Sequence, residues 1–116
     1  MFKKRLKSFS HAINGLVILI KEEPNARIHL LAAIVVILLA YILKISINEW
    51  ALIVISIGFV FCAELVNTSI ENLSDLVTKE YNPFIKKVKD LGAAAVLVAA
   101  FTAIIIACFI FLPKLF

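Results

Sequence analysis

The feature that most constrains this chain is a run of 22 residues, Leu91–Leu112, without a single Asp, Glu, Lys, Arg or His. As an α-helix rising about 1.5 Å per residue, such a run reaches across the hydrocarbon core of a bilayer, which is about 30 Å thick. It shows no alternation of apolar and polar residues, and it is far longer than membrane-barrel strands of about 9–11 residues. We therefore expect a transmembrane helix over residues 91–112, ended by Pro113 and Lys114.

Two earlier segments have the same character. Residues 28–47 are almost wholly apolar, and residues 50–77 are apolar from Trp50 to Ala63 and then continue the same helical pattern with carboxylates at intervals. Across the chain 63% of residues are hydrophobic and the mean hydropathy is +1.05, whereas ordinary domains are about half apolar and small ones cannot bury more. A soluble domain is excluded. The expected fold class is all-α integral membrane, with one domain over residues 1–116.

The first 27 residues form a segment of a different kind, in which apolar side chains recur every three or four positions with Lys and Arg between them. This pattern is typical of an amphipathic helix that lies on the membrane surface. A cleaved signal peptide is not expected, because the charged residues at 21–23 interrupt the apolar run before any cleavage site. Residues 1–27 are thus expected to form a surface helix and the lead-in to the first span.

Lysine and arginine are distributed unevenly about the three expected spans. Ten of the 12 precede residue 28 or lie between residues 78 and 90, and only Lys44 and Lys114 fall on the other side. Short cytoplasmic loops carry an excess of positive charge in membrane proteins. The N-terminus and residues 78–90 are therefore expected to face the cytoplasm.

Four polar side chains, Glu64, Asn67, Glu71 and Asp75, follow one another at i, i+3, i+7 and i+11 near the end of the second span. At about 100° per residue they occupy a sector of roughly 80° on one helix face. An ionised group at the bilayer centre costs at least about 2.5–3.5 kcal/mol, so these acids need compensation. One interpretation is a helix end that reaches water, with its acids solvated or paired with Lys79, Lys86 or Lys87.

The other interpretation is a site for a hard cation. Mg²⁺ prefers one or two carboxylates together with water and phosphate oxygens, and Glu71 with a second acid from Glu22–Glu23 would suit it. Lys89 and Asp90 adjoin the third span on the same side, where they could contact the phosphates and ribose of a nucleotide. An acid beside a helix start is also an ordinary N-terminal boundary. No glycine-rich phosphate loop is present.

Taken together, these residues resemble a known family. The resemblance is carried by Ala63-Glu-Leu-Val-Asn-Thr-Ser-Ile-Glu71, followed by Asp75 and then by Lys89-Asp-Leu-Gly-Ala-Ala-Ala-Val96. These segments are similar to the signature of the small prokaryotic diacylglycerol kinases and undecaprenol kinases. Upstream, Gly15-Leu16, Glu23 and Arg27 also fit, so the resemblance extends from around Lys4 to the C-terminus.

The resemblance implies a homotrimer in the prokaryotic inner membrane, each subunit having a surface helix and three membrane helices, with active sites shared between neighbouring subunits. It implies ATP as co-substrate, Mg²⁺ as cofactor, a membrane lipid alcohol as acceptor, and no nucleic acid as partner. Glu64 matches the general base that acts on the lipid hydroxyl, and Asn67 matches the polar residue that shapes the site. Glu23 and Glu71 match the metal ligands. The matched nucleotide-binding positions are Lys4, His11, Glu80, Tyr81, Asn82, Lys89 and Asp90.

Two acceptors stay open. The Asn67-Thr68 pair, His29 and the ending Phe111–Leu115 resemble the undecaprenol branch, whereas Glu80-Tyr81 resembles the diacylglycerol branch. We expect undecaprenol, with diacylglycerol as the alternative. Two non-enzymatic interpretations compete, a small exporter with an intramembrane Glu and a structural membrane subunit that packs through a stripe of alanines. The exporter is disfavoured because such a protein needs its carboxylate near the bilayer midplane and usually has four spans.

Overall fold

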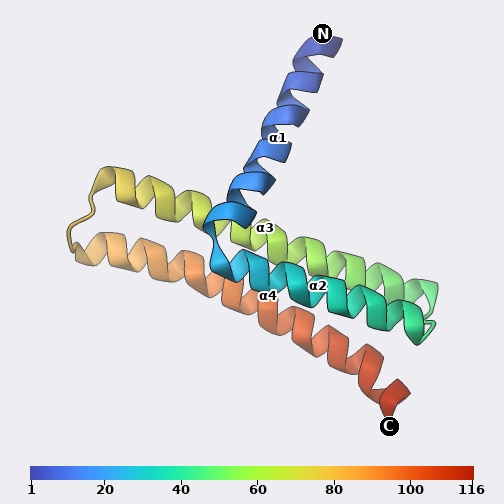
Figure 1. The fold of residues 1–116 in the computed structure, drawn as a ribbon. Helices are drawn as coiled ribbons and strands as arrows, with labels where there is room; N and C mark the ends of the chain where they lie inside the picture. The colour runs from blue at the N-terminus through green and yellow to red at the C-terminus, as the bar shows by residue number, and fades with distance from the viewer.

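The computed structural model describes residues 1–116 as four α-helices (Figure 1). In chain order they are α1 (Phe2–Glu22), α2 (Pro24–Ile42), α3 (Ile47–Val77) and α4 (Pro83–Leu115). α3 and α4 form a long antiparallel hairpin, α2 lies along one half of α3, and α1 projects steeply away from the other three (Figure 1). Helices α2, α3 and α4 are each long and apolar enough to cross a membrane, which confirms the all-helical class and three candidate spans.

The break between α1 and α2 lies at Glu23, whose backbone is extended at φ −108° and ψ 110°. Pro24 causes this break, because a proline disfavours the helical region for the residue before it. Proline is well suited to the first position of a helix, where its missing N–H costs no hydrogen bond. The first helix therefore ends at Glu22 rather than continuing toward residue 27, and Arg27 belongs to the first turn of α2.

The turn between α2 and α3 lies earlier in the sequence than predicted. α2 ends at Ile42 rather than near residue 47, and Lys44 adopts the left-handed conformation with φ 51°. Ser46 then starts α3 through a capping box: Glu49 N donates to Ser46 Oγ at 3.2 Å, and Ser46 N donates to Glu49 Oε1 at 2.9 Å. Two free N–H groups of the first turn are satisfied in this way, so α3 begins at Ile47, before Trp50.

Both ends of α4 differ from the predicted span of residues 91–112. Asn82 Oδ1 accepts from Phe84 N at 2.9 Å and from Ile85 N at 3.3 Å, so the helix starts at Pro83. The loop between α3 and α4 is therefore only residues 78–82. Pro113 does not end the helix, because in the last turn its missing N–H removes one hydrogen bond and leaves the next ones intact. Phe116 N still donates to Leu112 O at 3.0 Å.

Small residues allow the helices to approach closely. On α2 the buried positions are Ala26, Ala33 and Ala40, spaced by seven residues. On α4, Ala99 is fully buried, and the close backbone approach of α4 is to α3. Close approach through small side chains is the usual basis of helix packing in membranes.

The main hydrophobic cluster lies at the end of the molecule where α2 turns into α3 and where α4 ends. Its buried members are Ala40, Ile45, Ile53, Ile110 and Phe111. At the same end Lys114 Nζ donates to Glu49 Oε2 at 2.9 Å, which ties the end of α4 to the start of α3. This packing holds the three long helices together at the end opposite the polar α3–α4 turn.

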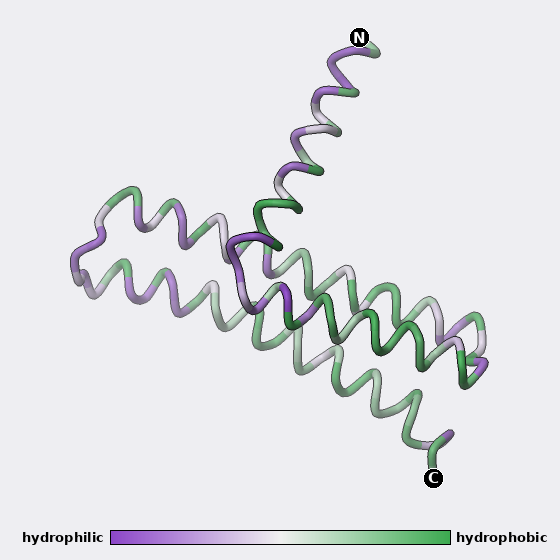
Figure 2. Tube along the Cα trace, viewed as in Figure 1, coloured by the Kyte–Doolittle hydropathy of each residue, from purple (hydrophilic) through white to green (hydrophobic).

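The three long helices differ in length, and the extra length of α3 and α4 carries polar residues beyond the start of α2. α2, with 19 residues, is about 28 Å long, close to the hydrocarbon thickness, whereas α3 and α4, with 31 and 33 residues, reach about 46 Å and 50 Å. The hairpin thus extends past the start of α2. Figure 2 shows that this projecting part is rich in hydrophilic residues, whereas the part beside α2 is mostly hydrophobic.

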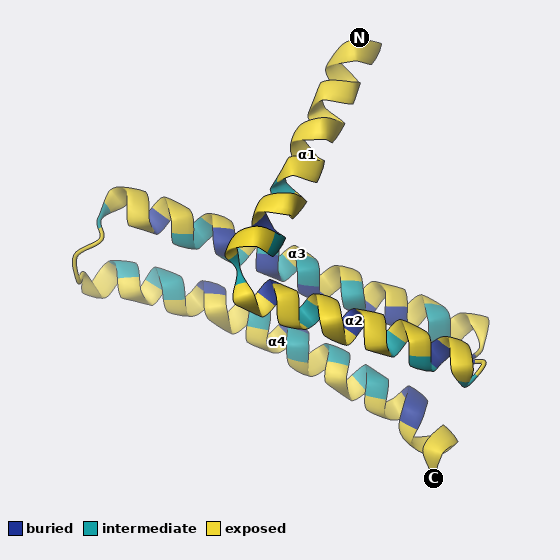
Figure 3. Cartoon of the chain, viewed as in Figure 1, coloured by how far each residue is buried: buried dark blue, intermediate teal, exposed yellow.

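Much apolar surface is left uncovered. The chain exposes 8769 Å², against about 6300 Å² for a compact soluble monomer of its mass. Only 15 of 116 residues are buried, and α1 is exposed around nearly its whole length (Figure 3). The outward faces of the three spans therefore need lipid or another protein chain against them.

Candidate active site

Glu64 lies in the middle of α3 at the level where α2 begins, and its side chain is only 2% exposed. The Nε2 atom of His29, in the second turn of α2, lies 3.2 Å from Glu64 Oε1. The two groups are close but not aligned, since no hydrogen bond reaches this buried oxygen. Burying a carboxylate without a hydrogen-bond partner is costly, so packing alone does not account for Glu64 at this position.

Asn67, one turn further along α3, donates from Nδ2 to Glu71 Oε1 at 3.2 Å. Its own Oδ1 is buried without a hydrogen-bond partner and faces α4 at Gly92. A Cβ at Gly92 would overlap Asn67 Oδ1 and touch Ile70. Because Gly92 has no side chain, the Asn67 amide fits against α4 at this point. From there Asn67 donates its hydrogen bond to Glu71.

Glu23, at the break between α1 and α2, belongs to the same cluster of acids. Partial burial, and then the nearby charges of Glu71, Glu64 and Glu22, raise the pKa of Glu23 above its ordinary value. The structure therefore brings Glu23 and Glu71 together electrostatically, although they are 48 positions apart in the sequence. No group of three or more His, Cys, Asp or Glu side chains has the geometry of a complete metal site.

The two residues predicted at the start of the third span are both in ion pairs. Lys89 Nζ lies 2.7 Å from Asp75 Oδ1 across the hairpin, and Lys86 Nζ lies 2.6 Å from Asp90 Oδ2 one turn away on α4. The sequence predicted Lys79, Lys86 or Lys87 as partners of the α3 acids, whereas Asp75 pairs with Lys89 instead. Both pairs are well exposed, where solvent screening leaves an ion pair with little effect on stability.

The remaining predicted nucleotide residues are scattered. Glu80, Tyr81 and Asn82 lie in the exposed loop between α3 and α4, and the Asn82 side chain is already used as the N-cap of α4. Lys4 and His11 are exposed residues of α1, the helix that extends away from the hairpin (Figure 1). Within one chain, α1 does not bring these two side chains to Glu64.

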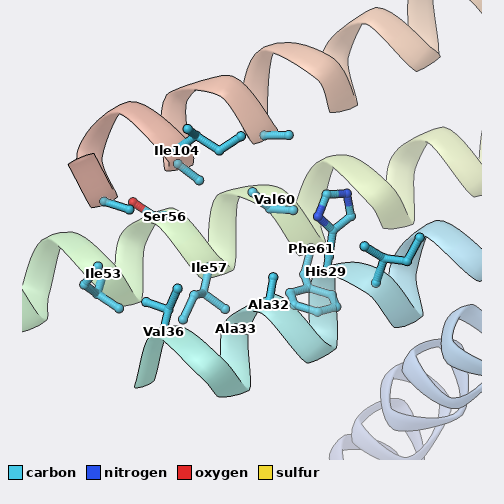
Figure 4. Close-up of a pocket in the computed structure, with 14 residues that line it drawn as sticks. His29, Ala32, Ala33, Val36, Ile53, Ser56, Ile57, Val60, Phe61 and Ile104 are labelled. Carbon is cyan, nitrogen blue, oxygen red and sulfur yellow. The ribbon is translucent and has the colours of Figure 1, made fainter. Parts of the chain in front are cut away.

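An apolar groove of about 320 Å³ runs between α2, α3 and α4. Twelve of its 14 lining residues are hydrophobic, and the exceptions are His29 and Ser56. In Figure 4, His29 stands at one end of the groove beside Val60 and Phe61. Glu64 does not line the groove, but His29 at this end of it lies 3.2 Å from Glu64 Oε1, so the buried carboxylate is next to the groove.

Two residues of this site were not predicted from the sequence as site residues. His29 carries a signal that could have identified it, because an ionisable side chain inside an apolar span marks function by default. Gly92 appears in the sequence analysis only as one residue of the segment from Lys89 to Val96, without a role of its own. Its role depends on the distance between two helices, which a single sequence does not show.

Comparisons with known proteins agree with this arrangement. A sequence model of the family described as prokaryotic diacylglycerol kinase matches residues 10–111. The undecaprenol kinase of Bacillus subtilis (strain 168) is 42% identical over 109 residues, which are 94% of this chain and 89% of that protein. The diacylglycerol kinase of Synechocystis sp. is 34% identical over 95% of this chain, which spans 63% of that protein's length. The diacylglycerol kinase of Escherichia coli (strain K12) is 28% identical over 92% of this chain and 88% of its own length.

Proposed function

The chain belongs to the prokaryotic diacylglycerol kinase family, and on this premise we propose that it transfers the γ-phosphoryl group of ATP to the hydroxyl of undecaprenol. Membership makes it a kinase of a lipid alcohol, so the exporter and structural-subunit interpretations do not hold. The undecaprenol kinase of Bacillus subtilis supports this acceptor, and diacylglycerol is the alternative because other relatives carry that name.

The observation that carries the proposal is the buried Glu64 carboxylate, which lies 3.2 Å from His29 at the end of an apolar groove. A general base must lie within hydrogen-bond reach of the hydroxyl that it deprotonates. An alcohol whose hydrocarbon chain lies among the apolar side chains presents its hydroxyl at the polar end of the groove, beside Glu64. We assign Glu64 the role of general base and Asn67 the role of holding Glu71 in place.

The donor set fits a hard cation. Glu23 and Glu71 offer carboxylate oxygens from two separate elements, and their mutual repulsion is what a divalent ion between them would relieve. These residues would hold Mg²⁺, which when bound neutralises charge on the phosphates of ATP. Asn67 Nδ2 fixes one oxygen of Glu71, so the other is free to bind.

The nucleotide site is proposed on the cytoplasmic side of this cluster. Lys89 and Asp75 form an exposed ion pair that contributes little to stability. The Lys89 ammonium can therefore leave Asp75 and bind a phosphate oxygen instead. Asp90, Glu80, Tyr81 and Asn82 surround the same end of the hairpin. Lys4 and His11, on α1, would contribute from the surface helix of this or a neighbouring subunit.

We further propose that three chains assemble and that α1 lies on the cytoplasmic membrane surface. Uncovered apolar faces on all three spans supply the area that assembly requires. The apolar side chains of α1 are exposed, and Lys and Arg lie between them, as in helices that bind anionic membrane surfaces. The same charge distribution supports a cytoplasmic N-terminus in the inner membrane.

The test is transfer of labelled phosphate from Mg·ATP to undecaprenol or to diacylglycerol in separate detergent micelles. Undecaprenol should be labelled faster, and Glu64→Gln should leave only a small residual rate. Glu49→Gln is the matched control, because it makes the same change at the other end of α3 and Gln still serves in a capping box. Faster labelling of diacylglycerol would establish the alternative acceptor. Labelling of neither alcohol by the native protein would refute the proposed reaction.

A further inference from the structure

We infer that His29 is a positioning residue for the reaction, and that it orients the Glu64 carboxylate toward the end of the apolar groove. This inference rests on the proposed function, because it concerns how the proposed base is held. The role assigned to His29 is to act through Glu64 without itself accepting the substrate proton.

The first observation is the isolation of the carboxylate. Glu64 Oε1 is buried, it receives no hydrogen bond, and its one ion-pair contact is with His29 Nε2 at 3.2 Å. Asn67 does not help, because its amide donates to Glu71 instead. A small rotation of the imidazole or of the carboxylate would align an N–H of His29 with Oε1, which gives this oxygen the partner that it lacks.

The second observation comes from the groove. Only His29 and Ser56 among its lining residues are not hydrophobic. The Ser56 hydroxyl already donates to Leu52 O on its own helix at 2.8 Å. His29 is therefore the one polar side chain of the groove that is not already hydrogen-bonded, and it stands at the end nearest Glu64 (Figure 4).

The two observations together explain what the contact does. The final torsion of a glutamate side chain is broad and roughly two-fold, so an unheld carboxylate rotates freely. An N–H of His29 on Oε1 leaves Oε2 as the oxygen that meets the acceptor hydroxyl. In the transfer, that hydroxyl proton passes to Glu64, the acceptor oxygen forms the new bond to the γ-phosphorus, and the bond from phosphorus to the leaving oxygen of ADP breaks.

The inference is tested by steady-state phosphorylation of the lipid acceptor with three variants. His29→Leu removes the N–H, and His29→Gln restores a donor at a similar reach. Thr102→Val is the control, because the Thr102 hydroxyl donates to Val98 O on its own helix and Thr102 does not line the groove. Because misplaced reacting groups cost up to about 100-fold in rate, we expect kcat of His29→Leu to fall between about tenfold and 100-fold while KM for Mg·ATP is unchanged. His29→Gln should recover most of kcat, and Thr102→Val should match the native protein.

A double-variant comparison separates positioning from a purely structural role. If His29 acts through Glu64, adding His29→Leu to Glu64→Gln should lower the residual rate no further, because coupled residues are not additive. Equal fractional losses in both backgrounds would overturn the inference, as would an unchanged kcat in His29→Leu or a loss that His29→Gln does not repair. Thermal unfolding of each variant in detergent identifies a loss caused by misfolding, and His29→Gln then decides the question. An inactive native protein would instead refute the proposed function.

Discussion

Replacing Gly92 by Ala places a methyl group where the Asn67 amide now lies. The new Cβ would overlap Asn67 Oδ1, approach Asn67 Cγ at 3.5 Å and reach Ile70 Cδ1 at 3.7 Å. The backbone of α4 is held against α3 along its length, so the Asn67 side chain has to move. That movement breaks the 3.2 Å hydrogen bond from Asn67 Nδ2 to Glu71 Oε1.

The expected effects on stability and activity differ in size. Overpacking costs about 1–3 kcal/mol, but alanine is about 1 kcal/mol better than glycine inside a helix, so the free energy of unfolding should fall by only about 0–2 kcal/mol. A hydrogen bond to a charged group is worth about 1.5–3 kcal/mol. If Glu71 holds the metal on ATP, losing its partner should lower kcat/KM for Mg·ATP by about tenfold to 150-fold, since about 1.4 kcal/mol is a factor of ten.

The assay is kcat/KM for Mg·ATP, measured beside thermal unfolding in the same detergent. Gly58→Ala is the matched control, because no atom lies within 4 Å of the added Cβ and only the gain in helix propensity remains. Adding Asn67→Ala to Gly92→Ala removes the overlap, so this pair should restore the lost stability but not the lost activity. Native kcat/KM in Gly92→Ala would show that the close approach of α4 does not position Asn67.

Three further predictions follow from other parts of the structure. Lys114→Gln breaks the ion pair with Glu49 and should lower the free energy of unfolding by about 0–1 kcal/mol with kcat unchanged, as measured by thermal unfolding and turnover. Asn82→Ala removes the N-cap of α4 and should cost about 1 kcal/mol, seen as faster hydrogen exchange at Phe84 and Ile85 and not in α2. Because the pKa of Glu23 is raised, the folded metal-free protein holds this proton more tightly than the unfolded chain, so its stability should fall as pH rises from about 4.5 through that raised value. The proton competes with Mg²⁺, so the apparent KM for Mg²⁺ should rise as pH falls through the same range, and Glu23→Gln should remove this dependence.

The three spans, and the polar side chains at 64, 67, 71 and 75 on one helix face, were predictable because both depend on local periodicity. Three long apolar helices follow from hydropathy alone, and the i, i+3, i+7 spacing of Glu64, Asn67 and Glu71 places them on one face of any α-helix. The hydrogen bond between Asn67 and Glu71 is a local consequence of the same spacing. The helix ends were less accurate. Pro113 was expected to stop α4, but a proline in the last turn removes too little hydrogen bonding to do so.

What the amino-acid sequence determined by itself is therefore the environment of the chain, the number of spans and the identity of the acids, because each depends on neighbours within a few turns. Only the tertiary structure decided which groups face those acids from other helices. His29 of α2 lies beside Glu64, and Gly92 of α4 leaves space for the Asn67 amide. The break before α2 brings Glu23 near the acids of α3. These contacts depend on the distance and rotation between packed helices. Small buried residues such as Ala33 and Ala99 set both, but their spacing in the sequence does not show which helix they pack against.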